Sequence, residues 1–459
     1  MKDFNSVSLD ENIENEYIGL GTEDVIEAPG YTPQEAELMY DNRNLEHKRV
    51  LLVNTVVGPG NSVGRLVAGL YETLEQHGYD CLVAYGRGEC PENIRSYRIG
   101  KDFDVYVHGA MTRLRDKHGF YSTKATKEFI EVIEEFDPDI IHLHNIHGYY
   151  LNVKVLFEYI KASGRRIIWT LHDCWSFTGH CSHFEYVGCM KWSTKLGCSK
   201  CEQLEEYPKS LGYDNSEENF RLKRELFTGV ENMTIVTPSE WLRQRVLMSF
   251  LKNYHVVVVP TGIDLDRFRP VDEEMSRDNI IFKLKNALSI RGKKILLGVA
   301  NPWRERKGLS QFVNLDKVIS DKYAIVLLGL DDEQAEKLPE SIVTLAKTDS
   351  IEELAAIYSM ADVYVNLSLE DTFPTTNLEA LACGTPVLTY KTGGSPESID
   401  ETCGISVEKN SIQGVIAGLD KIELSKGYAF TKEQCVLRAM QYDKNTRFVE
   451  YIQEVYEGI

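Results

Sequence analysis

Strand-like apolar runs alternate with helix-length spacers along nearly the whole chain, and this alternation limits the fold more than any other feature. The runs in the first half are RVLLVNT (49–55), CLVAY, DIIHLH, RRIIWTLHD, MTIVTPS and HVVVVPTG. The alternation restarts in the second half with KKILLGVA (293–300), YAIVLLGL, SIVTLA, ADVYVNLS, PVLTY and GISV. Parallel strands need crossovers long enough for a helix, so the pattern predicts two successive α/β domains.

A chain of 459 residues is also too long for one compact core. We predict an N-terminal Rossmann-like domain at 48–270 and a C-terminal Rossmann-like domain at 271–435. The amphipathic segment 436–459 is predicted to be helical and to pack back toward the N-terminal domain. Doubly wound sheets bind ligands at the carboxyl ends of their strands, so the cleft between the two domains is the expected site.

The net charge of −19 argues against general affinity for nucleic acid or anionic lipid. Residues 1–47 carry twelve acidic and two basic residues, which is −10 of that total. We interpret them as a poorly ordered or loosely docked acidic extension, with partner binding as the alternative. Without a signal peptide pattern or a long apolar run, we expect a cytoplasmic protein. The stretch SEWLRQRVLMSFLKN, which suits a core helix better, would allow contact with the inner face of the membrane.

The stretch EDTFPTTNLEALACGTPVLTYKTGGSPE places Asp371 before a turn and Glu379 inside a predicted helix. Backbone N–H groups at such a helix start favour phosphate, and a carboxylate one turn inside accepts hydrogen bonds from sugar hydroxyls. The stretch resembles the E-x7-E region of the retaining glycosyltransferases of family four, which have the GT-B fold of two Rossmann-like domains facing across a cleft. Two other segments, VVVVPTGIDLDRFRP and GVANPWRERKGLSQF, resemble motifs of the same family in the same order.

The resemblance implies roles for single residues of this stretch. Glu379 would bind the ribose hydroxyls of a nucleotide, and Asp371 a hydroxyl of the donor sugar. Thr375 and Thr376 would offer amides to the donor, and Phe373 belongs to the same loop. Two departures affect how the donor is positioned: the first acid is Asp where the family usually has Glu, and proline, which has no N–H, stands at 374 where glycine is common.

The loop GVANPWRERKGLSQF contributes the positive charge. Lys307 matches the family lysine that meets the donor diphosphate. The arginine usually found five or six residues earlier is absent, so Arg304 or Arg306 is expected to supply a guanidinium. The alternative is that these bases form a solvated surface.

In the first half, GPGNSVGR lies between a strand and a helix, where Gly60, Ser62 and Gly64 would let a phosphate or an acceptor approach the backbone. The spacing differs from a dinucleotide fingerprint, which disfavours a nicotinamide oxidoreductase. His172 ends the strand of IIWTLHDCW and matches the family histidine near the reacting centre. His144 is a second cleft candidate, for which we favour a structural role.

Five of the ten cysteines fall within residues 174–201, in a cysteine-rich insertion at about 174–215. Four of them offer thiolates for tetrahedral zinc: Cys181, Cys189, Cys198 and Cys201. Reduced unbound thiols and oxidised pairs are the alternatives. A zinc knuckle of this kind would be structural and would shape the acceptor side.

Together these features predict a retaining hexosyltransferase that moves a sugar from a nucleotide diphosphate to a hydroxyl of a saccharide or lipid-linked acceptor. No catalytic metal is expected, because Lys307, an arginine and helix N-termini would stabilise the departing diphosphate. The alternatives are a sugar-nucleotide epimerase or a glycosyl phosphorylase on the same fold, and a non-catalytic zinc-bearing scaffold.

Overall fold

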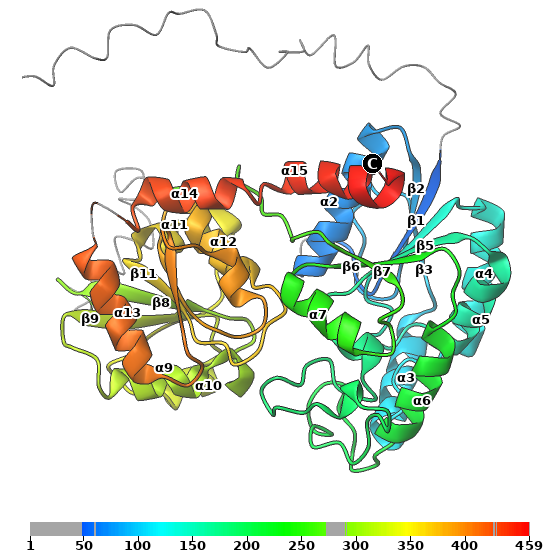
Figure 1. The fold of residues 1–459 in the computed structure, drawn as a ribbon, viewed down its shortest axis with the longest axis horizontal. Helices are drawn as coiled ribbons and strands as arrows, with labels where there is room; N and C mark the ends of the chain where they lie inside the picture. Colours follow the sequence, from blue (N-terminus) through cyan, green and yellow to red (C-terminus); the bar gives the residue numbers. More distant parts are fainter. Residues whose placement is uncertain are drawn as a thin grey trace, which may run out of the picture. The chain divides into compact units, whose positions relative to one another are not determined.

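Two parallel sheets organise the computed structural model, as the alternation of apolar runs predicts (Figure 1). The structure describes residues 48–58, 61–271, 290, 292–425, 427 and 429–458. The acidic extension at 1–47 lies outside these residues, as does much of the predicted junction after 271. Both sheets belong to one compact unit.

The first sheet has the strand order β3-β2-β1-β4-β5-β6-β7, and each neighbouring pair is parallel. Its strands are β1 (Arg49–Asn54), β2 (Asp80–Tyr85), β3 (Ser96–Arg98), β4 (Ile140–Leu143), β5 (Arg166–Thr170), β6 (Met233–Thr237) and β7 (His255–Val258). The helices between them are α2 (Ser62–Gln76), α3 (Asp102–Arg115), α4 (Thr123–Phe136), α5 (Val153–Ser163), α6 (Ser216–Phe227) and α7 (Glu240–Met248), with short 3₁₀ turns η1 (Trp175–Phe177) and η2 (Lys191–Ser193) in the insertion. We call this part the first lobe.

The second sheet has the order β10-β9-β8-β11-β12-β13 and is also parallel throughout. Its strands are β8 (Lys294–Val299), β9 (Tyr323–Leu328), β10 (Val343–Leu345), β11 (Val363–Asn366), β12 (Val387–Tyr390) and β13 (Gly404–Val407). Its helices are η4 (Glu305–Lys307), α9 (Leu309–Asp316), α10 (Asp332–Glu336), α11 (Ile351–Met360), α12 (Thr375–Ala382), η5 (Ser395–Ser398), α13 (Ile412–Leu424) and α14 (Lys432–Met440). We call this part the second lobe.

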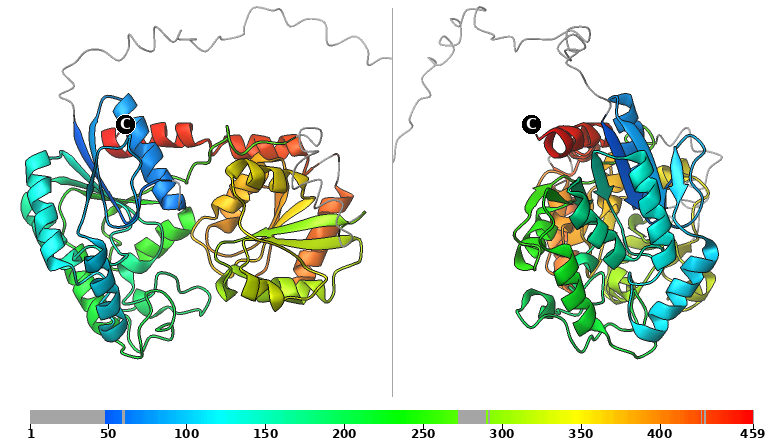
Figure 2. Two further views of the ribbon diagram at one scale, coloured as in Figure 1. Left: turned by 180° about the vertical axis from the view of Figure 1, so that it is seen from behind. Right: turned by 90° about the vertical axis from the view of Figure 1, so that its right-hand side faces the viewer.

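Helices cover both faces of each sheet, so both faces of the central strands are buried (Figures 1 and 2). Along β1, Val50 and Leu52 belong to one apolar cluster, whereas Leu51 and Val53 belong to the cluster on the other face. A strand buried on both sides reads as a continuous apolar run, which is why the sequence reveals these strands clearly.

The last helices pack against the first lobe although they follow the second lobe in sequence. Helix α15 (Lys444–Glu450) and the π-helical turn η6 (Tyr451–Glu457) bury Phe448, Tyr451 and Tyr456 in the cluster that contains Val50. Helix α15 lies beside α2 (Figure 1). The Tyr456 hydroxyl is hydrogen-bonded to Nδ1 of His142 at 2.6 Å, and Tyr451 is hydrogen-bonded to Thr170.

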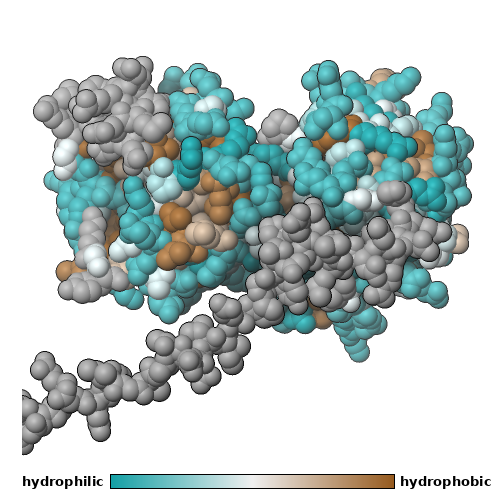
Figure 3. Space-filling model, turned by 90° about the horizontal axis from the view of Figure 1, so that it is seen from above, coloured by the Kyte–Doolittle hydropathy of each residue, from teal (hydrophilic) through white to brown (hydrophobic). Residues whose placement is uncertain are grey.

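On the face shown in Figure 3, hydrophilic residues surround small hydrophobic groups. Among the described residues, none of the helices combines the length and the apolar character needed to span a bilayer.

Candidate active site

A cavity of about 250 Å³ opens among loops that follow the carboxyl ends of strands in both sheets. His172 follows β5, Pro238 follows β6 and Thr261 follows β7 on the side of the first lobe. The second lobe contributes Lys307 from the loop after β8 and residues 371–376 from the loop after β11. Ligands of parallel α/β sheets bind at these strand ends. We call this space the central cavity.

An ion pair between Lys307 and Asp371 lies at the central cavity, with 2.6 Å between Nζ and Oδ2. Burial alone raises the pKa of Asp371, but the ammonium of Lys307, with smaller effects from His183 and Arg306, outweighs it and leaves the pKa lowered. The carboxylate is therefore ionised at neutral pH, and the half-buried pair keeps two opposite charges at the cavity wall.

Two glycines allow the loops of this ion pair to pack closely. Gly308 has φ +82°, and a Cβ there would lie 2.1 Å from the carbonyl oxygen of Leu367. Gly393 has φ +54°, and a Cβ there would lie 1.5 Å from the carbonyl oxygen of Asp371. A side chain at either position would clash with these carbonyl groups and push the loops apart. The Lys-Gly and Gly-Gly pairs of the sequence therefore allow the backbone around Lys307 and Asp371 to pack as it does.

The half-buried His172 reaches the cavity from the first lobe. Its Nε2 is hydrogen-bonded to Nδ1 of His144 at 3.1 Å, and its carbonyl accepts a hydrogen bond of 2.9 Å from Oγ1 of Thr372. Burial lowers the pKa of His172 to about 4, so its ring is neutral at pH 7. Burial also lowers the pKa of His144, whose hydrogen bond holds the ring of His172 in place.

Other predicted residues that line the central cavity are Ser62, Arg306, Phe373, Thr375 and Thr376. Helix α12 begins at Thr375, with Pro374 as its N-cap residue. The first turn of α12 therefore meets the cavity, and the N-terminus of a helix favours negative charge.

Three predicted donor residues that the structure describes do not line the central cavity. Glu379 is buried in α12 and accepts a 2.9 Å hydrogen bond from the Tyr358 hydroxyl. Arg304 lines a neighbouring cavity instead. Gly64 lies inside α2, where a Cβ would meet the carbonyl oxygen of Gly58 at 2.9 Å. The lack of a side chain at Gly64 therefore accommodates the backbone of the preceding loop and not a ligand. Gly60 lies outside the described residues.

His183 is a cavity residue that the sequence analysis missed. Burial, reinforced by the charge of Arg306, lowers its pKa to about 4, so it is also neutral at pH 7. It lies in the run GHCSHF, which the cysteines led us to interpret as a zinc knuckle. The sequence signal that could have identified His183 is the clustering of histidines near HDCW.

The four predicted zinc ligands line one small cavity of about 20 Å³. They are present as free thiols, and the hydrogen bond from Cys181 lowers the pKa of Cys201 to about 7. His180 lines the same cavity, and its buried Nε2 has no hydrogen-bond partner in the structure. Within the described ranges, however, no group of three or more His, Cys, Asp or Glu side chains would hold a metal ion as it stands. Zinc therefore stays a prediction.

Two family models match consecutive parts of the chain. Residues 63–267 match the model described as Glycosyltransferase Family 4, and residues 281–439 match the model described as Glycosyl transferases group 1. The chain is a family-four glycosyltransferase. The two matches coincide with the first and second lobes, and they confirm the family expected from the sequence motifs.

Curated relatives of this glycosyltransferase include a protein of Escherichia coli strain K12 named as a colanic acid biosynthesis glycosyl transferase, WcaC. It is 27% identical over 301 residues, which are 63% of this chain and 67% of that protein. The alpha-monoglucosyldiacylglycerol synthase of Streptococcus pneumoniae is 31% identical over 34% of this chain and 37% of its own. A D-inositol 3-phosphate glycosyltransferase of Corynebacterium jeikeium is 29% identical over 31% of this chain and 37% of its own.

Solved structures of low sequence identity share the fold of this glycosyltransferase. The sucrose-phosphate synthase of Thermosynechococcus elongatus has a TM-score of 0.64 at 16% identity, covering 89% of this chain and 98% of its own. HepE of Anabaena, solved in complex with UDP-glucose, has a TM-score of 0.60 at 13% identity, covering 90% of this chain and 100% of its own. These matches confirm the predicted GT-B fold of two Rossmann-like domains.

Proposed function

We propose that this glycosyltransferase moves a sugar from a nucleotide diphosphate to a hydroxyl of a saccharide or lipid-linked acceptor, with retention at the anomeric carbon. The observation that carries the proposal is the Lys307–Asp371 ion pair, which places a cation and a hydrogen-bond acceptor side by side in the central cavity. A diphosphate needs the first group, and a sugar hydroxyl needs the second.

The diphosphate of the donor is proposed to lie near Lys307, Arg306 and the first turn of α12. As its bond to the sugar breaks, negative charge grows on the departing phosphate. The two cations and the helix N-terminus stabilise that charge, which is the work of a divalent ion in other transferases. No catalytic metal is part of the proposal.

Asp371 is proposed to accept a hydrogen bond from a hydroxyl of the donor sugar. His172, neutral at pH 7, lines the cavity from the first lobe and is held by a hydrogen bond with His144, so it adds no positive charge beside the proposed sugar site. Glu379 remains a prediction as the ribose ligand. In that role it would exchange the hydrogen bond of the Tyr358 hydroxyl for bonds to the ribose, or share its second oxygen with them.

A role in the synthesis of a cell-surface polysaccharide is also proposed. It is supported by the name of the Escherichia coli relative, which matches the longest part of the chain among the relatives described above. The lipid-linked acceptor and a contact with the inner face of the membrane are proposals that rest on the family resemblance.

Structural zinc in the cysteine-rich insertion is a separate proposal. Cys181, Cys189, Cys198 and Cys201 would hold the ion if their side chains turned toward the cavity they share. Metal analysis of the protein purified without chelator tests it: one zinc per chain supports the site, and a metal-free, fully reduced and folded protein overturns it.

The test of the main function begins with thermal stability in the presence of UDP, GDP and their common sugars. Binding to the folded state raises the melting temperature by mass action, so the matching nucleotide should stand out. NMR of the product then reports the anomeric configuration. An inverted product would exclude retention, and turnover that needs no acceptor hydroxyl would favour the epimerase or phosphorylase alternative.

A further inference from the structure

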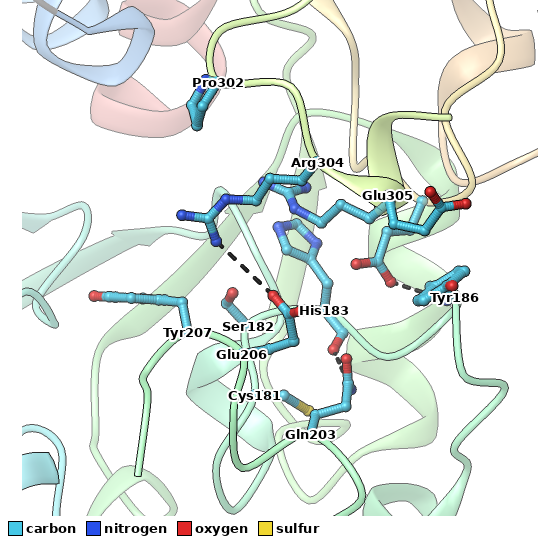
Figure 4. A pocket seen from close by; sticks show the side chains of 12 residues that line it. Cys181, Ser182, His183, Tyr186, Gln203, Glu206, Tyr207, Pro302, Arg304 and Glu305 are labelled. Carbon is cyan, nitrogen blue, oxygen red and sulfur yellow. Dashed lines mark hydrogen bonds and ion pairs between the residues drawn. The ribbon is translucent and has the colours of Figure 1, made fainter. Parts of the chain in front are cut away.

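A second cavity of about 250 Å³ adjoins the central cavity, and much of its wall comes from the cysteine-rich insertion (Figure 4). Gln203 and Glu206 line it from the insertion, and Arg304 lines it from the loop after β8. His183 and Arg306 line both cavities. A ligand in the second cavity, which we call the insertion pocket, would therefore meet the contents of the central cavity at these two side chains.

The insertion pocket offers hydrogen-bonding groups between aromatic rings. Ser182 contributes a hydroxyl and Glu206 a carboxylate. The hydroxyl of Tyr207 is hydrogen-bonded to Nδ1 of His147 at 3.1 Å, away from the pocket, so Tyr207 presents its ring. Tyr186 lies on the opposite side (Figure 4). Hydroxyl-binding groups beside aromatic faces suit a sugar, which is polar at its edge and apolar on its C–H faces.

The charges around the insertion pocket disfavour an anionic ligand. Two guanidinium groups line it, and Arg304 is already within 3.8 Å of the Glu206 carboxylate. Glu305 and Glu370 add two more carboxyl groups, so the lining has no excess of positive charge. A phosphate would need such an excess. The polar lining equally disfavours a lipid tail, and the volume is below the about 300–1,000 Å³ of sites for larger ligands.

We propose that the insertion pocket holds one uncharged, hydroxyl-rich sugar unit of the acceptor, with its reacting hydroxyl directed past His183 toward the Lys307–Asp371 pair. This inference rests on the proposed function. Gln203 fixes His183 through a 2.8 Å hydrogen bond from Nε2 to the His183 carbonyl oxygen (Figure 4). His183 is a positioning residue in this arrangement, because it stands where the two cavities meet.

The transfer step balances without any further reactant. The acceptor oxygen forms a bond to the anomeric carbon, and the bond from that carbon to the donor phosphate oxygen breaks. The electron pair of the broken bond stays on the diphosphate, which takes the proton of the acceptor hydroxyl. The acceptor sugar needs only to present its hydroxyl on the face from which the diphosphate departs.

Two adjacent exposed glutamates give a matched pair of variants. Glu206→Trp places an indole at the insertion pocket, whereas Glu205→Trp adds the same ring next to it on a residue that does not line the pocket. The probes are the methyl α-glycosides of glucose, galactose and mannose, added with the nucleotide that stabilises the wild type. Saturation-transfer NMR measures their binding, mass spectrometry measures transfer, and thermal stabilisation by the nucleotide measures donor binding.

We expect the wild type and Glu205→Trp to bind at least one glycoside, and Glu206→Trp to bind it about tenfold or more weakly while keeping donor stabilisation. Equal glycoside binding by the two variants would overturn the assignment of the pocket. Wild-type protein that binds none of the three glycosides, but accepts inositol phosphate or diacylglycerol, would overturn the sugar class. Wild-type protein that binds no nucleotide would instead overturn the proposed function. Failure of the proposed function is therefore distinguishable from failure of the pocket assignment.

Discussion

Lys307 and Asp371 come from loops 64 residues apart, and the ammonium of Lys307 lowers the pKa of the Asp371 carboxyl group. Removing the lysine leaves a half-buried carboxylate without its cation. A buried charge without a partner is costly, so the variant must be judged by folding as well as by rate.

The first prediction concerns this lysine. Lys307→Met should lower kcat by about 100- to 1,000-fold, because one preorganised cation on the departing phosphate is lost. Circular dichroism should show a folded protein, and steady-state assays with the nucleotide sugar provide the rate. Lys337→Gln removes an exposed lysine paired with Glu333 and serves as the control, with an unchanged rate. A Lys307→Met enzyme as fast as the wild type would remove Lys307 from the mechanism.

Individual site residues were predictable from sequence where they belong to a continuous motif. Lys307, Asp371 and the start of α12 belong to continuous motifs, and they line the cavity. The burial of Glu379 against Tyr358 and the position of His183 between the two cavities were not predictable. They depend on residues from distant parts of the chain, namely Tyr358 and the insertion. Whether these residues act as expected stays a prediction.

At the scale of elements, α2 and α15 touch where a glycine meets an aromatic ring. A Cβ at Gly69 would lie 2.7 Å from the Phe448 ring, so the absence of a side chain sets how closely the last helix can pack. The phenylalanine is 7% exposed and belongs to the cluster that contains β1.

The second prediction follows from this contact. Gly69→Ala should destabilise the protein by about 1–3 kcal/mol, since an added methyl group in a packed interface forces side chains to move. Urea unfolding measures the change. Gly109→Ala in α3 is the matched control: its Cβ would meet only Tyr149 at 3.9 Å, so the change should be neutral or stabilising by about 0.5–1 kcal/mol. The contact is unimportant if both variants unfold alike.

Most elements were predictable because strands buried on both faces have a strong apolar signal. Strand β3 (Ser96–Arg98) was missed: it is three residues long, at the edge of the sheet, and none of the three is fully buried. The sequence predicted that the last segment packs toward the first lobe, but it did not predict the contact between α15 and α2. The glycine that permits it carries no hydrophobic signal in the sequence.

At the scale of the whole molecule, two carboxyl groups, one buried and one half-buried, form hydrogen bonds between the lobes. Glu370 of the second lobe accepts a 2.9 Å hydrogen bond from the amide of Tyr186 in the insertion. Glu185 of the insertion accepts one of 3.0 Å from the amide of Gly393. Burial raises the pKa of both side chains, so ionising them costs free energy in the folded protein.

The third prediction uses the sign of this shift. Because the pKa of Glu370 is raised above its unfolded value, its favourable contribution is complete below pH 4.5 and is lost as pH rises through the folded pKa. Glu370→Gln keeps an acceptor for Tyr186 but cannot ionise. The variant should therefore be more stable than the wild type at pH 7.5, with a smaller advantage near pH 5.

Chemical denaturation at the two pH values measures the effect of Glu370→Gln. Exposed Glu336→Gln, at the end of α10, is the control and should follow the wild type at both. A Glu370→Gln variant less stable than the wild type at pH 7.5 would contradict this prediction. It would mean that the Tyr186 amide and the charge of Arg306 together stabilise the ionised carboxylate by more than burial costs it.

The return of the final helices to the first lobe restricts how such enzymes can be recombined. Arg166 donates a hydrogen bond to the carbonyl oxygen of Val455, so β5 is tied to a segment almost 300 positions later. A chimera that swaps only the second lobe with that of a relative needs two junctions, one near 271 and one near 443. With a single junction, the foreign chain would have to supply the aromatic residues that fill the positions of Phe448, Tyr451 and Tyr456 in the host's first lobe.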